Sequence, residues 1–453
     1  MTEPNPSDRA PADPTGEITD GISEDGDSAH GSANGLSRRD LLTGAAGAIG
    51  GALLARVGTL DAQGAPAQPT GVTPATAGAQ VLADPTKAPG LPTSGQGTRS
   101  PFVSPQRTPT GAIAGSSLTP LQDLSGTITP SDLHFERHHA GIPALDPARH
   151  TLLIHGLVDR PSVFTLADIM RFPYVSRVHF VECSGNGRAA YRDPNNETFT
   201  AQSVAGLAAN SEWIGVPLRV LFQEVGAKPE ATWFLAEGGD ACVMTRSIPM
   251  AKALDDAMIV WAQNGEPIRP EQGYPMRLLL PGWEGNANVK WLRRLELGTA
   301  PWMTRWETSK YTDPLASGTA RQFSFEVDAR SIITAPSHPG TVTKGWCNIS
   351  GLAWSGRGAI TRVEVSTDGA KSWVDALLHP PVASKAFTRF SIPWSWDGGA
   401  AALLSRATDD TGYVQPTREQ IVAVRGAGTD YHLNHIVGWR VDADGRVFFY
   451  GDS

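Results

Sequence analysis

Glycine and proline interrupt this chain so often that long helices are disfavoured. The 453 residues include 48 glycines and 35 prolines. Glycine loses the most backbone freedom on folding and proline removes a backbone donor, so both weaken helix interiors. The 13 tryptophans add to a composition that favours strands and loops over helix bundles. The sequence therefore predicts short elements in a fold of the α+β type.

The first 117 residues differ in composition from the rest. Residues 1–36 are polar and acidic, and we expect them to be disordered. The pair Arg38-Arg39 precedes a Gly/Ala-rich apolar stretch, 43–55, as in a twin-arginine export signal. The alternative is an exposed basic pair beside a small helix. The stretch is short for a membrane span and Arg56 interrupts it, so we expect no permanent membrane anchor.

We therefore predict four segments along the chain. Residues 1–67 form a polar leader and export signal, cleaved around 62–67, so that the mature protein is periplasmic or otherwise extracytoplasmic. Residues 68–117, rich in Pro, Thr, Ala, Gly and Ser, form a flexible linker. A first domain covers 118–317 and a second covers 318–453.

Charge and cysteine content exclude several classes of protein. The formal net charge of −8 argues against general nucleic-acid binding, which needs a basic face. The three cysteines, Cys183, Cys242 and Cys347, are too few and too scattered for a disulfide framework. Because no CxxCH motif occurs, we expect no covalently attached haem in this chain.

Local patterns in the first domain predict a mixture of strands and short helices. Strands are expected over 151–158, 257–263 and 276–280, and over Val175–Glu182 directly before Cys183. Thr165 and Asp168 form a capping-box pattern for a helix that Pro173 ends. A second, amphipathic helix is expected after Pro217 and before Gly226. Asn264-Gly265 indicates a tight turn.

In the second domain the helical signals fade and short strands follow one another. A hairpin pattern covers 360–366 and 372–377 around Asp368-Gly369, and a last strand is expected over Val447–Tyr450. A segment of this length built of short strands predicts an immunoglobulin-like sandwich. His338-Pro339-Gly340 resembles a triplet from haem-binding domains, but no segment of haem-domain size surrounds it, so we interpret it as a turn.

One cysteine has a setting that suggests chemistry. Cys183 follows a predicted strand and opens the run Cys-Ser-Gly-Asn-Gly-Arg, which ends at Arg188. Glycines allow such a loop to wrap closely around a ligand, and Arg188 could contact an anion or lower the pKa of the thiol. Arg137 lies in Phe-Glu-Arg-His-His, residues 135–139. Taken singly, a cysteine near glycines is usually an inert buried thiol, and arginines such as these are usually solvated.

Together these motifs resemble the sulfite oxidase superfamily of molybdopterin enzymes. The resemblance continues through Gly273–Arg277, Val289–Trp291, Trp306 with Tyr311, Ser350–Gly356, Ser366–Trp373 and Ala407–Asp410. Within the superfamily, the cysteine motif, the stretch 349–358 and the ending from Tyr431 are similar to SoxC, the molybdenum subunit of the sulfane dehydrogenases. The ordered similarity extends over about residues 120–440 and implies a molybdopterin-binding domain followed by a dimerisation domain.

The resemblance also implies a cofactor and roles for individual residues. Molybdenum with molybdopterin would bind one protein thiolate, and Cys183 matches that ligand. Arg137, Arg188 and Tyr311 match the substrate pocket, where guanidinium groups hold an anion. Phe135, His139, Arg277, Asn288, Val289 and Lys290 match pterin and phosphate contacts, and Asp240 is a weaker match. Two positions depart from the family: Gln272 replaces an expected histidine, and Gly187-Arg188 replaces an arginine pair.

The activity implied is oxidation of sulfur by oxygen-atom transfer, with water as the oxygen source. SoxC acts on sulfane sulfur bound to the cysteine of a carrier protein, and we expect electrons to leave to a c-type cytochrome. The chain would form a homodimer, or a hetero-oligomer with a cytochrome subunit. Free sulfite as substrate is the alternative. A methionine-sulfoxide reductase of the superfamily would lack the second domain, and a non-catalytic adhesion module would not need Cys183, Arg137, Arg188 and Tyr311 together.

Overall fold

A computed structural model describes residues 89–315 and 317–451 of the chain. The predicted leader, export signal and cleavage region, and the linker up to residue 88, lie outside these residues. Across the ranges that are described, no helix has both the length and the apolar character that a membrane crossing requires.

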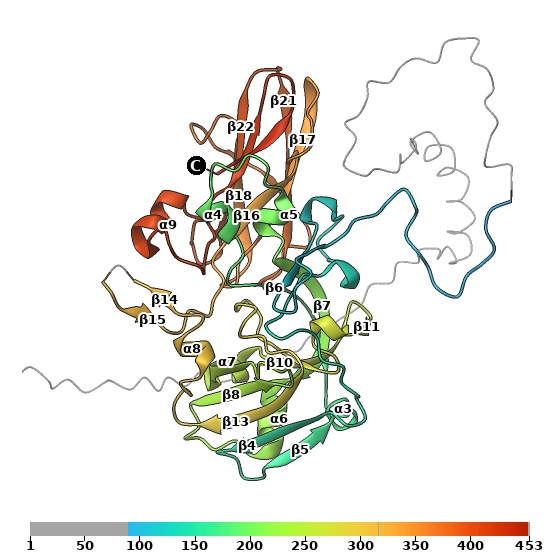
Figure 1. The fold of residues 1–453 in the computed structure, drawn as a ribbon, viewed down its shortest axis with the longest axis vertical. Coiled ribbons are helices and arrows are strands. Elements are labelled where there is room, and N and C mark those ends of the chain that lie inside the picture. Colours follow the sequence, from blue (N-terminus) through green and yellow to red (C-terminus); the bar gives the residue numbers. More distant parts are fainter. Residues whose placement is uncertain (1–88, 316, 452–453) are drawn as a thin grey trace, which may run out of the picture. The chain divides into compact units, whose positions relative to one another are not determined.

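Two five-stranded sheets and the helices packed on them form most of the first domain (Figure 1). One sheet has the order β5-β4-β13-β8-β9, in which only β4 and β13 run parallel. Its strands are β4 (Thr151–Gly156), β5 (Ser162–Thr165), β8 (Trp233–Gly238), β9 (Thr245–Pro249) and β13 (Leu292–Gly298). The other has the order β11-β10-β7-β6, with β12 also paired to β10. It contains β6 (Val175–Glu182), β7 (Ala208–Pro217), β10 (Met258–Gln263), β11 (Glu266–Pro267) and β12 (Arg277–Leu279).

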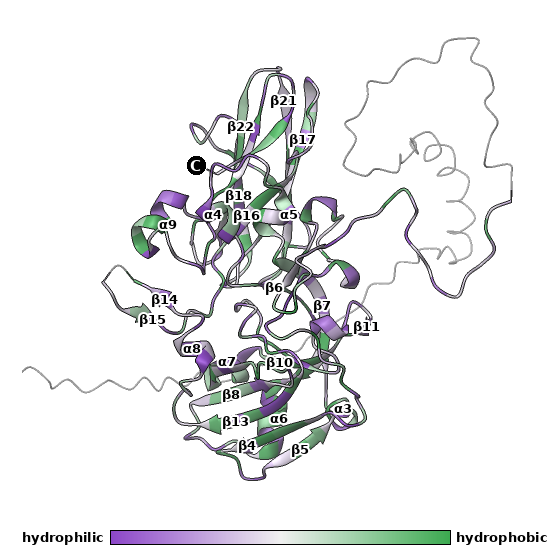
Figure 2. Ribbon diagram, in the orientation of Figure 1, coloured by the Kyte–Doolittle hydropathy of each residue, from purple (hydrophilic) through white to green (hydrophobic). Residues whose placement is uncertain are grey.

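Short helices connect and cover these strands. They are α3 (Leu166–Ile169), α4 (Arg188–Arg192), α5 (Ala201–Ala205), α6 (Leu218–Val225), α7 (Met250–Asp255) and α8 (Arg305–Thr308), with 3-10 turns at Leu121–Asp123, Ser131–Leu133 and Pro270–Gln272. Helix α6 buries Leu218, Leu221, Phe222 and Val225 in a core shared with strands of both sheets. Figure 2 shows the hydrophobic residues of α6 and β4 that supply this core.

Local sequence signals predicted several of these elements correctly. Strand β6 has the predicted bounds, and the capping box of Thr165 and Asp168 opens α3. Gly226 ends α6 with φ 67°, a left-handed conformation that glycine adopts without strain. The predicted turn at Asn264-Gly265, with φ of 50° and 81°, joins β10 to β11.

The flexible-linker prediction is wrong for residues 108–117. Strands β1 (Thr108–Pro109), β2 (Ser116–Leu118) and β3 (Glu136–Arg137) form a small antiparallel sheet. Just before β1, the Arg107 guanidinium donates to the His134 carbonyl at 3.1 Å and lies 3.5 Å from Glu136. Composition alone did not reveal this pairing because a Thr- and Ser-rich segment can either stay free or add a strand to an exposed edge.

The second domain contains two antiparallel sheets that share one core, as predicted for a sandwich. The first, β16-β17-β21-β20, contains β16 (Arg330–Ala335), β17 (Gly345–Trp354), β20 (Leu377–His379) and β21 (Thr388–Trp396). The second, β19-β18-β22-β23-β24, contains β18 (Ile360–Ser366), β19 (Val374–Asp375), β22 (Ala401–Asp409), β23 (Gly438–Val441) and β24 (Val447–Tyr450). A separate pair, β14 (Asp313–Pro314) and β15 (Ala320–Arg321), lies between the domains in sequence.

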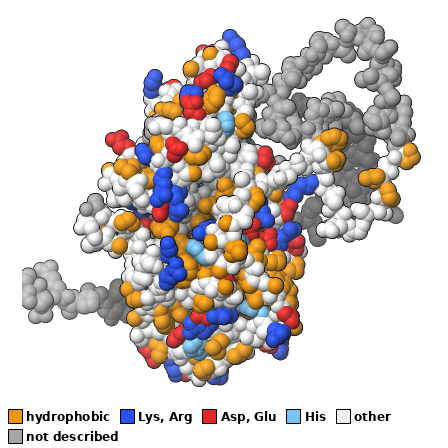
Figure 3. Space-filling view, viewed as in Figure 1, with side chains coloured by type: hydrophobic (Ala, Val, Ile, Leu, Met, Phe, Trp, Pro, Cys, Tyr) orange, Lys and Arg blue, Asp and Glu red, His pale blue; other side chains and the backbone are white. Residues whose placement is uncertain are grey.

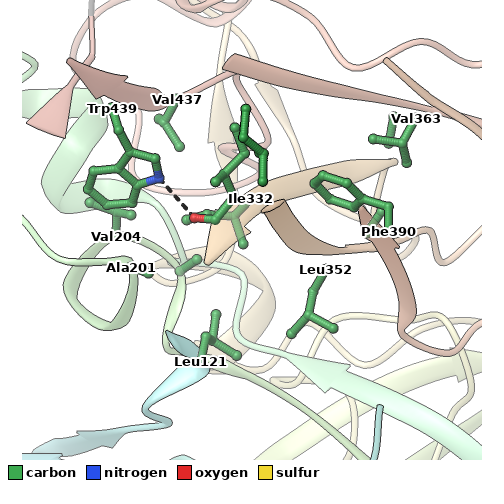
Figure 4. Packing of buried hydrophobic residues seen from close by; sticks show 14 of the residues in the cluster. Leu121, Ala201, Val204, Ile332, Leu352, Val363, Phe390, Val437 and Trp439 are labelled. Carbon is green, nitrogen blue, oxygen red and sulfur yellow. Dashed lines mark hydrogen bonds between the residues drawn. The ribbon is translucent and has the colours of Figure 1, made fainter. Parts of the chain in front are cut away.

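The core of the sandwich also contains side chains from the first domain. Figure 4 shows Leu121, Ala201 and Val204 packed beside Ile332, Leu352 and Trp439. The cluster also includes Phe180 of β6. The two domains therefore share buried apolar surface, which is the main source of stabilisation on folding.

Two details of the second domain differ from the prediction. The second arm of the hairpin divides: Val374 pairs with Val365 in β18, but Leu377 pairs with Ser391 in the other sheet. A helix, α9 (Arg418–Arg425), also interrupts the strands. Its signal is present in the sequence, because Thr417 and Gln420 form a capping box. The triplet at His338 is part of a turn in which Gly340 N donates to Ser337 O at 2.7 Å, as predicted.

Figure 3 shows one face of the molecule, on which basic and acidic side chains are interspersed. Elsewhere on the surface of the described residues, charges pair at close range, as in Arg440 with Asp442 and Arg446 with Asp444. Exposed pairs of this kind contribute little to stability.

Candidate active site

A cavity lies in the first domain where several loops meet. Concave sites lined by apolar side chains and a few polar groups are where proteins usually bind ligands. All but one of the residues that the sequence singled out line it: Phe135, Arg137, His139, Cys183, Asp240, Arg277, Asn288, Val289, Lys290 and Tyr311. The exception is Arg188. Widely separated parts of the chain thus converge on one concave site.

Cys183 follows the last residue of β6 and is held by backbone contacts. Its N–H donates to Leu207 O at 2.9 Å, and its carbonyl accepts from Asn186 N at 2.9 Å. Burial raises the pKa of the thiol, a backbone hydrogen bond from Gly185 opposes that rise, and Arg137 and Arg188 lower the pKa by their charge to a smaller extent. The sulfur is therefore protonated without a metal, and a bound metal would displace the proton.

Arg137 lies at the rim of the cavity, in strand β3. This strand pairs with β2, and the Arg137 guanidinium donates to the carbonyl of His138. His138 in turn contacts Glu136 at 2.8 Å and accepts from Lys290 Nζ at 2.9 Å. The small sheet therefore fixes the backbone from which the Arg137 side chain reaches the cavity.

Tyr311 and His139 form a hydrogen-bonded pair inside the cavity. The Tyr311 hydroxyl and His139 Nε2 are 2.6 Å apart, and the His139 ring packs 4.6 Å from that of Trp306. Burial and the charge of Arg137 lower the pKa of His139 to about 4, and burial raises the pKa of Tyr311. Near neutral pH the imidazole is therefore uncharged and the phenol protonated. Such a pair can donate a hydrogen bond to an oxygen atom and exchange a proton through it.

Two basic side chains lie at the back of the cavity. Arg277 donates to Gln272 O and to Asn288 O, each at 3.1 Å, and burial lowers its pKa to about 9. Lys290 Nζ also donates to Arg137 O at 3.2 Å and Glu271 O at 3.0 Å, and burial, with the charge of Arg277, lowers its pKa to about 7. A bound anion would stabilise the charged form of both side chains.

The cavity wall also carries polar atoms that need a partner. Within the described ranges, Arg277 Nε, His134 Nε2 and Asn286 Oδ1 are buried without one. A buried donor or acceptor left unpaired costs about 1–3 kcal/mol. A heterocyclic cofactor with both N–H and carbonyl groups would supply the missing partners. These residues therefore fit a pterin beside Cys183.

Some predicted contact residues use their side chains within the protein. Asn288 accepts from Leu280 N at 2.6 Å and donates to two carbonyls. Asp240 accepts from Met244 N at 3.0 Å and from the Cys242 thiol at 2.7 Å. The side chains of Asn288 and Asp240 are therefore already hydrogen-bonded within the protein. Gln272, at the position that departs from the family, donates to Phe135 O at 2.8 Å and so holds the backbone of the 135–139 motif in place.

Arg188 lies outside the lining of this cavity. Its Nε and Nη2 atoms donate to the Asp430 carbonyl at 3.2 and 3.1 Å, and its guanidinium carbon lies 5.6 Å from the centre of the Tyr431 ring. That ring lies 5.3 Å from the ring of Tyr311. Arg188 therefore lies beside Tyr431, whose ring packs near that of the cavity residue Tyr311.

Some residues that line the cavity were given no role from the motifs: His134, Glu136, His138, Val181, Met244, Gly285, Asn286 and Trp291. The first three alternate with Phe135, Arg137 and His139, and the alternation of a strand would have turned them away from the cavity. Met244 and Asn286 lie outside the motifs. Cys242 is bound to Asp240, and Cys347 packs against the core of the second domain.

Comparison with known proteins identifies both domains. A family model for the oxidoreductase molybdopterin binding domain matches residues 139–306, and one for the Mo-co oxidoreductase dimerisation domain matches residues 321–438. The NADH nitrate reductase 1 of Oryza sativa subsp. japonica is 30% identical over 65% of this chain and 36% of its own length. The mitochondrial sulfite oxidase of Rattus norvegicus is 28% identical over 68% and 61%. The chain thus spans about a third of the length of the nitrate reductases it matches.

A solved structure is similar over nearly the whole of its chain. The sulfane dehydrogenase SoxCD from Paracoccus pantotrophus has a chain that is 43% identical, with a TM-score of 0.72 over 83% of this chain and 95% of its own. Together with the two family models, this similarity places the domains in the predicted order. The chain therefore belongs to the sulfite oxidase family of molybdenum oxidoreductases, whose cofactor is molybdopterin.

Proposed function

We propose that this enzyme oxidises sulfane sulfur carried on a cysteine of a carrier protein and passes the electrons to a c-type cytochrome. The observation that carries the proposal is the 43% identity to the sulfane dehydrogenase chain over 95% of its length. The motifs around Cys183 and Tyr431 point the same way. The proposal includes the substrate, the electron acceptor and the role of each site residue.

Each group of site residues would have a separate role. Cys183 supplies the thiolate that binds molybdenum, a soft ligand suited to a redox-active metal. Arg277 and Lys290 bind the pterin and its phosphate by charge-assisted hydrogen bonds. The cofactor supplies the oxygen-atom transfer and the two-electron redox change.

Substrate would be held at the open side of the cavity. Arg137 places a guanidinium beside Cys183 and would attract the negative charge of a terminal sulfur or its oxidised forms. The Tyr311 hydroxyl, held by His139, would orient the oxygen of water or of the substrate and pass a proton. Because water would be the oxygen source, protons would be released, and the uncharged His139 could accept one through the Tyr311 hydroxyl.

Free sulfite is the second candidate substrate. The similarity to a mitochondrial sulfite oxidase supports it, and sulfite would need the same guanidinium and hydroxyl groups. A substrate carried on a protein differs in one physical respect, because its carrier must also dock at the mouth of the cavity.

The test compares specificity constants for the two substrates with the purified holoenzyme and a c-type cytochrome. Carrier-bound sulfane should be oxidised with the higher kcat/KM, and raising the salt concentration should slow that reaction more steeply, because charge steers protein docking. A carrier protein whose cysteine is alkylated is the control. Efficient sulfite turnover with no activity on the carrier would establish the sulfite alternative.

A further inference from the structure

A buried carboxylate lies directly before the metal ligand and is bound by the second domain. Glu182 is the last residue of β6 and is 5% exposed. Its Oε1 atom accepts from Arg330 Nη1 at 2.9 Å and from Asn186 Nδ2 at 2.7 Å, and its Oε2 atom accepts from Trp354 Nε1 at 2.6 Å. Arg330 begins β16 and Trp354 ends β17, so both belong to the second domain.

The same contacts enclose the loop that carries Cys183. Arg330 Nη2 donates to Val204 O at 3.0 Å, and Asn186 Nδ2 donates to Ala205 O at 3.0 Å. The Leu207 backbone, two residues beyond Ala205, accepts from Cys183 N and donates to Asn186 Oδ1. The cysteine is therefore fixed between α5 and the paired strands of the second domain.

Gly187 shows how closely the second domain approaches this loop. It has φ 89°, and a Cβ atom there would lie 2.6 Å from Leu433 O and 3.1 Å from Arg330 Nη2. No side chain fits at this position without displacing the second domain. The glycine, which replaces an arginine expected from the family pattern, thus leaves room for the Arg330 guanidinium.

We infer that Glu182, held by Arg330 and Trp354, is a positioning residue through which the second domain sets the orientation of the Cys183 ligand. The inference rests on Cys183 as metal ligand and is independent of the substrate. A charge buried at this site is retained only with its partners, since removing one partner leaves the other unpaired. Groups that orient a metal ligand tune the metal as well as hold it.

The test uses two tryptophans of the second domain that match each other closely. Trp354 and Trp439 are both fully buried, and each indole N–H makes one hydrogen bond. Trp439 donates to Ile333 O at 2.8 Å (Figure 4), whereas Trp354 donates to Glu182. Trp354→Phe and Trp439→Phe therefore remove the same group from the same core, but only the first removes a bond to Glu182.

Two properties of the holoenzyme are measured besides turnover: the Mo(V) electron paramagnetic resonance spectrum and the rate of cofactor release. Trp354→Phe should shift the g values and speed cofactor release, by up to the roughly 10- to 100-fold by which loss of an outer partner weakens metal binding. Trp439→Phe should lose comparable thermal stability and keep both properties. Glu182→Gln should behave like Trp354→Phe, and if that variant does not fold, the tryptophan pair decides alone.

Equal spectra and release rates in the two tryptophan variants would overturn the inference. Cys183→Ser separates this outcome from failure of the proposed site, because it replaces a soft thiolate by a hard hydroxyl and should abolish the native signal and turnover while the fold survives. A wild-type spectrum in Cys183→Ser would remove the ligand assignment itself. If Cys183→Ser loses the Mo(V) signal while Trp354→Phe and Trp439→Phe have the same spectra and release rates, Cys183 is the ligand and the role of Glu182 is rejected.

Discussion

Arg137 and Arg188 differ in surroundings, although the sequence predicted the same role for both. Arg137 lines the cavity beside Cys183, while Arg188 is bound to the Asp430 carbonyl and stacks on Tyr431. Both guanidinium groups donate to a backbone carbonyl, but that of Arg188 also contacts the Asp430 carboxylate at 3.1 Å, which offsets its charge and leaves less attraction for a substrate anion. The two arginines should therefore contribute unequally to catalysis.

Arg137→Met should lower kcat/KM about 100- to 1000-fold, because it removes a donor aimed at developing negative charge. Arg188→Met, the matched substitution, should lower it by a much smaller factor. Steady-state kinetics on both variants, with thermal melts to compare their stability, make the measurement. Equal losses of kcat/KM would mean that Arg188 reaches the substrate after rearrangement of the Tyr431 ring.

Motif neighbours could be predicted from the sequence, but long-range partners could not. Phe135, Arg137 and His139 belong to one short motif, so recognising that motif located all three at the cavity. Glu182 stands next to Cys183, yet its partner Arg330 is 148 residues away. No local pattern links such a pair, because the contact depends on how the two domains pack.

At the scale of elements, the sequence predicted those helix ends that interactions within a few residues determine. The capping box at Thr165 and the glycine after α6 fix helix ends through bonds within a few residues. The crossing of the chain from β19 to β20 was missed, because alternation in the sequence does not say which sheet a strand joins. Helix α9 was not predicted, although Thr417 and Gln420 form a capping box, because the neighbouring segments have the pattern of strands.

A buried histidine joins the end of the second domain to the active-site loops. His432 Nδ1 contacts Glu284 at 2.8 Å and its Nε2 contacts Asp313 at 3.1 Å, while Arg425 lies 3.3 Å from Asp313. Its backbone N–H donates to Ser184 O at 3.0 Å. Burial alone would lower its pKa, but the charge of Glu284 and the hydrogen bonds that the imidazole donates to both carboxylates raise it to about 9.

Because of His432, we expect the free energy of unfolding to decline as the pH rises into the mildly alkaline range. An unfolded histidine has a pKa near 6.5, so between that pH and about 9 only the folded protein holds the extra proton. The contribution is complete below pH 6.5 and falls by about 1.4 kcal/mol per pH unit up to the folded pKa. Denaturant melts from pH 6 to 9.5 should show this loss in the free energy of unfolding.

His432→Gln should flatten that pH dependence and lower stability most at acidic pH. His379→Gln is the control, because His379 bonds only the neutral Ser391 hydroxyl at 2.7 Å. If the wild type and His432→Gln lose stability in parallel above pH 6.5, other groups cause the decline.

For the whole molecule, the second domain predicts association of two chains. Its match to a dimerisation domain covers residues 321–438, and one sheet face in that range carries exposed apolar side chains. Trp346 and Leu377 are 72% and 65% exposed, and their partners on β21, Ser395 and Ser391, put them on the same face. Exposed apolar surface of this kind often marks an interface.

We expect the purified chain to sediment as a homodimer, or as a complex with a cytochrome subunit through this face. Trp346→Glu should shift sedimentation velocity towards the monomer, because a buried unpaired carboxylate opposes association. Val163→Glu, on strand β5 of the first domain, is the control at a similarly exposed position. A dimer that survives Trp346→Glu unchanged would place the interface elsewhere.

We expect the folded enzyme to be exported on the signal that contains Arg38-Arg39. A cofactor assembled in the cytoplasm must be loaded before transport, which suits a pathway that moves folded proteins. Receptors of that pathway recognise the arginine pair itself, so Lys-Lys at 38–39 should leave the precursor in the cytoplasm although the charge is kept. Fractionation of a bacterial host, with immunoblotting for the chain and molybdenum analysis of each fraction, measures the outcome. Arg56→Lys makes the same exchange after the apolar stretch and should be exported normally. An unchanged periplasmic yield from the Lys-Lys variant would show that the basic pair is not the export signal.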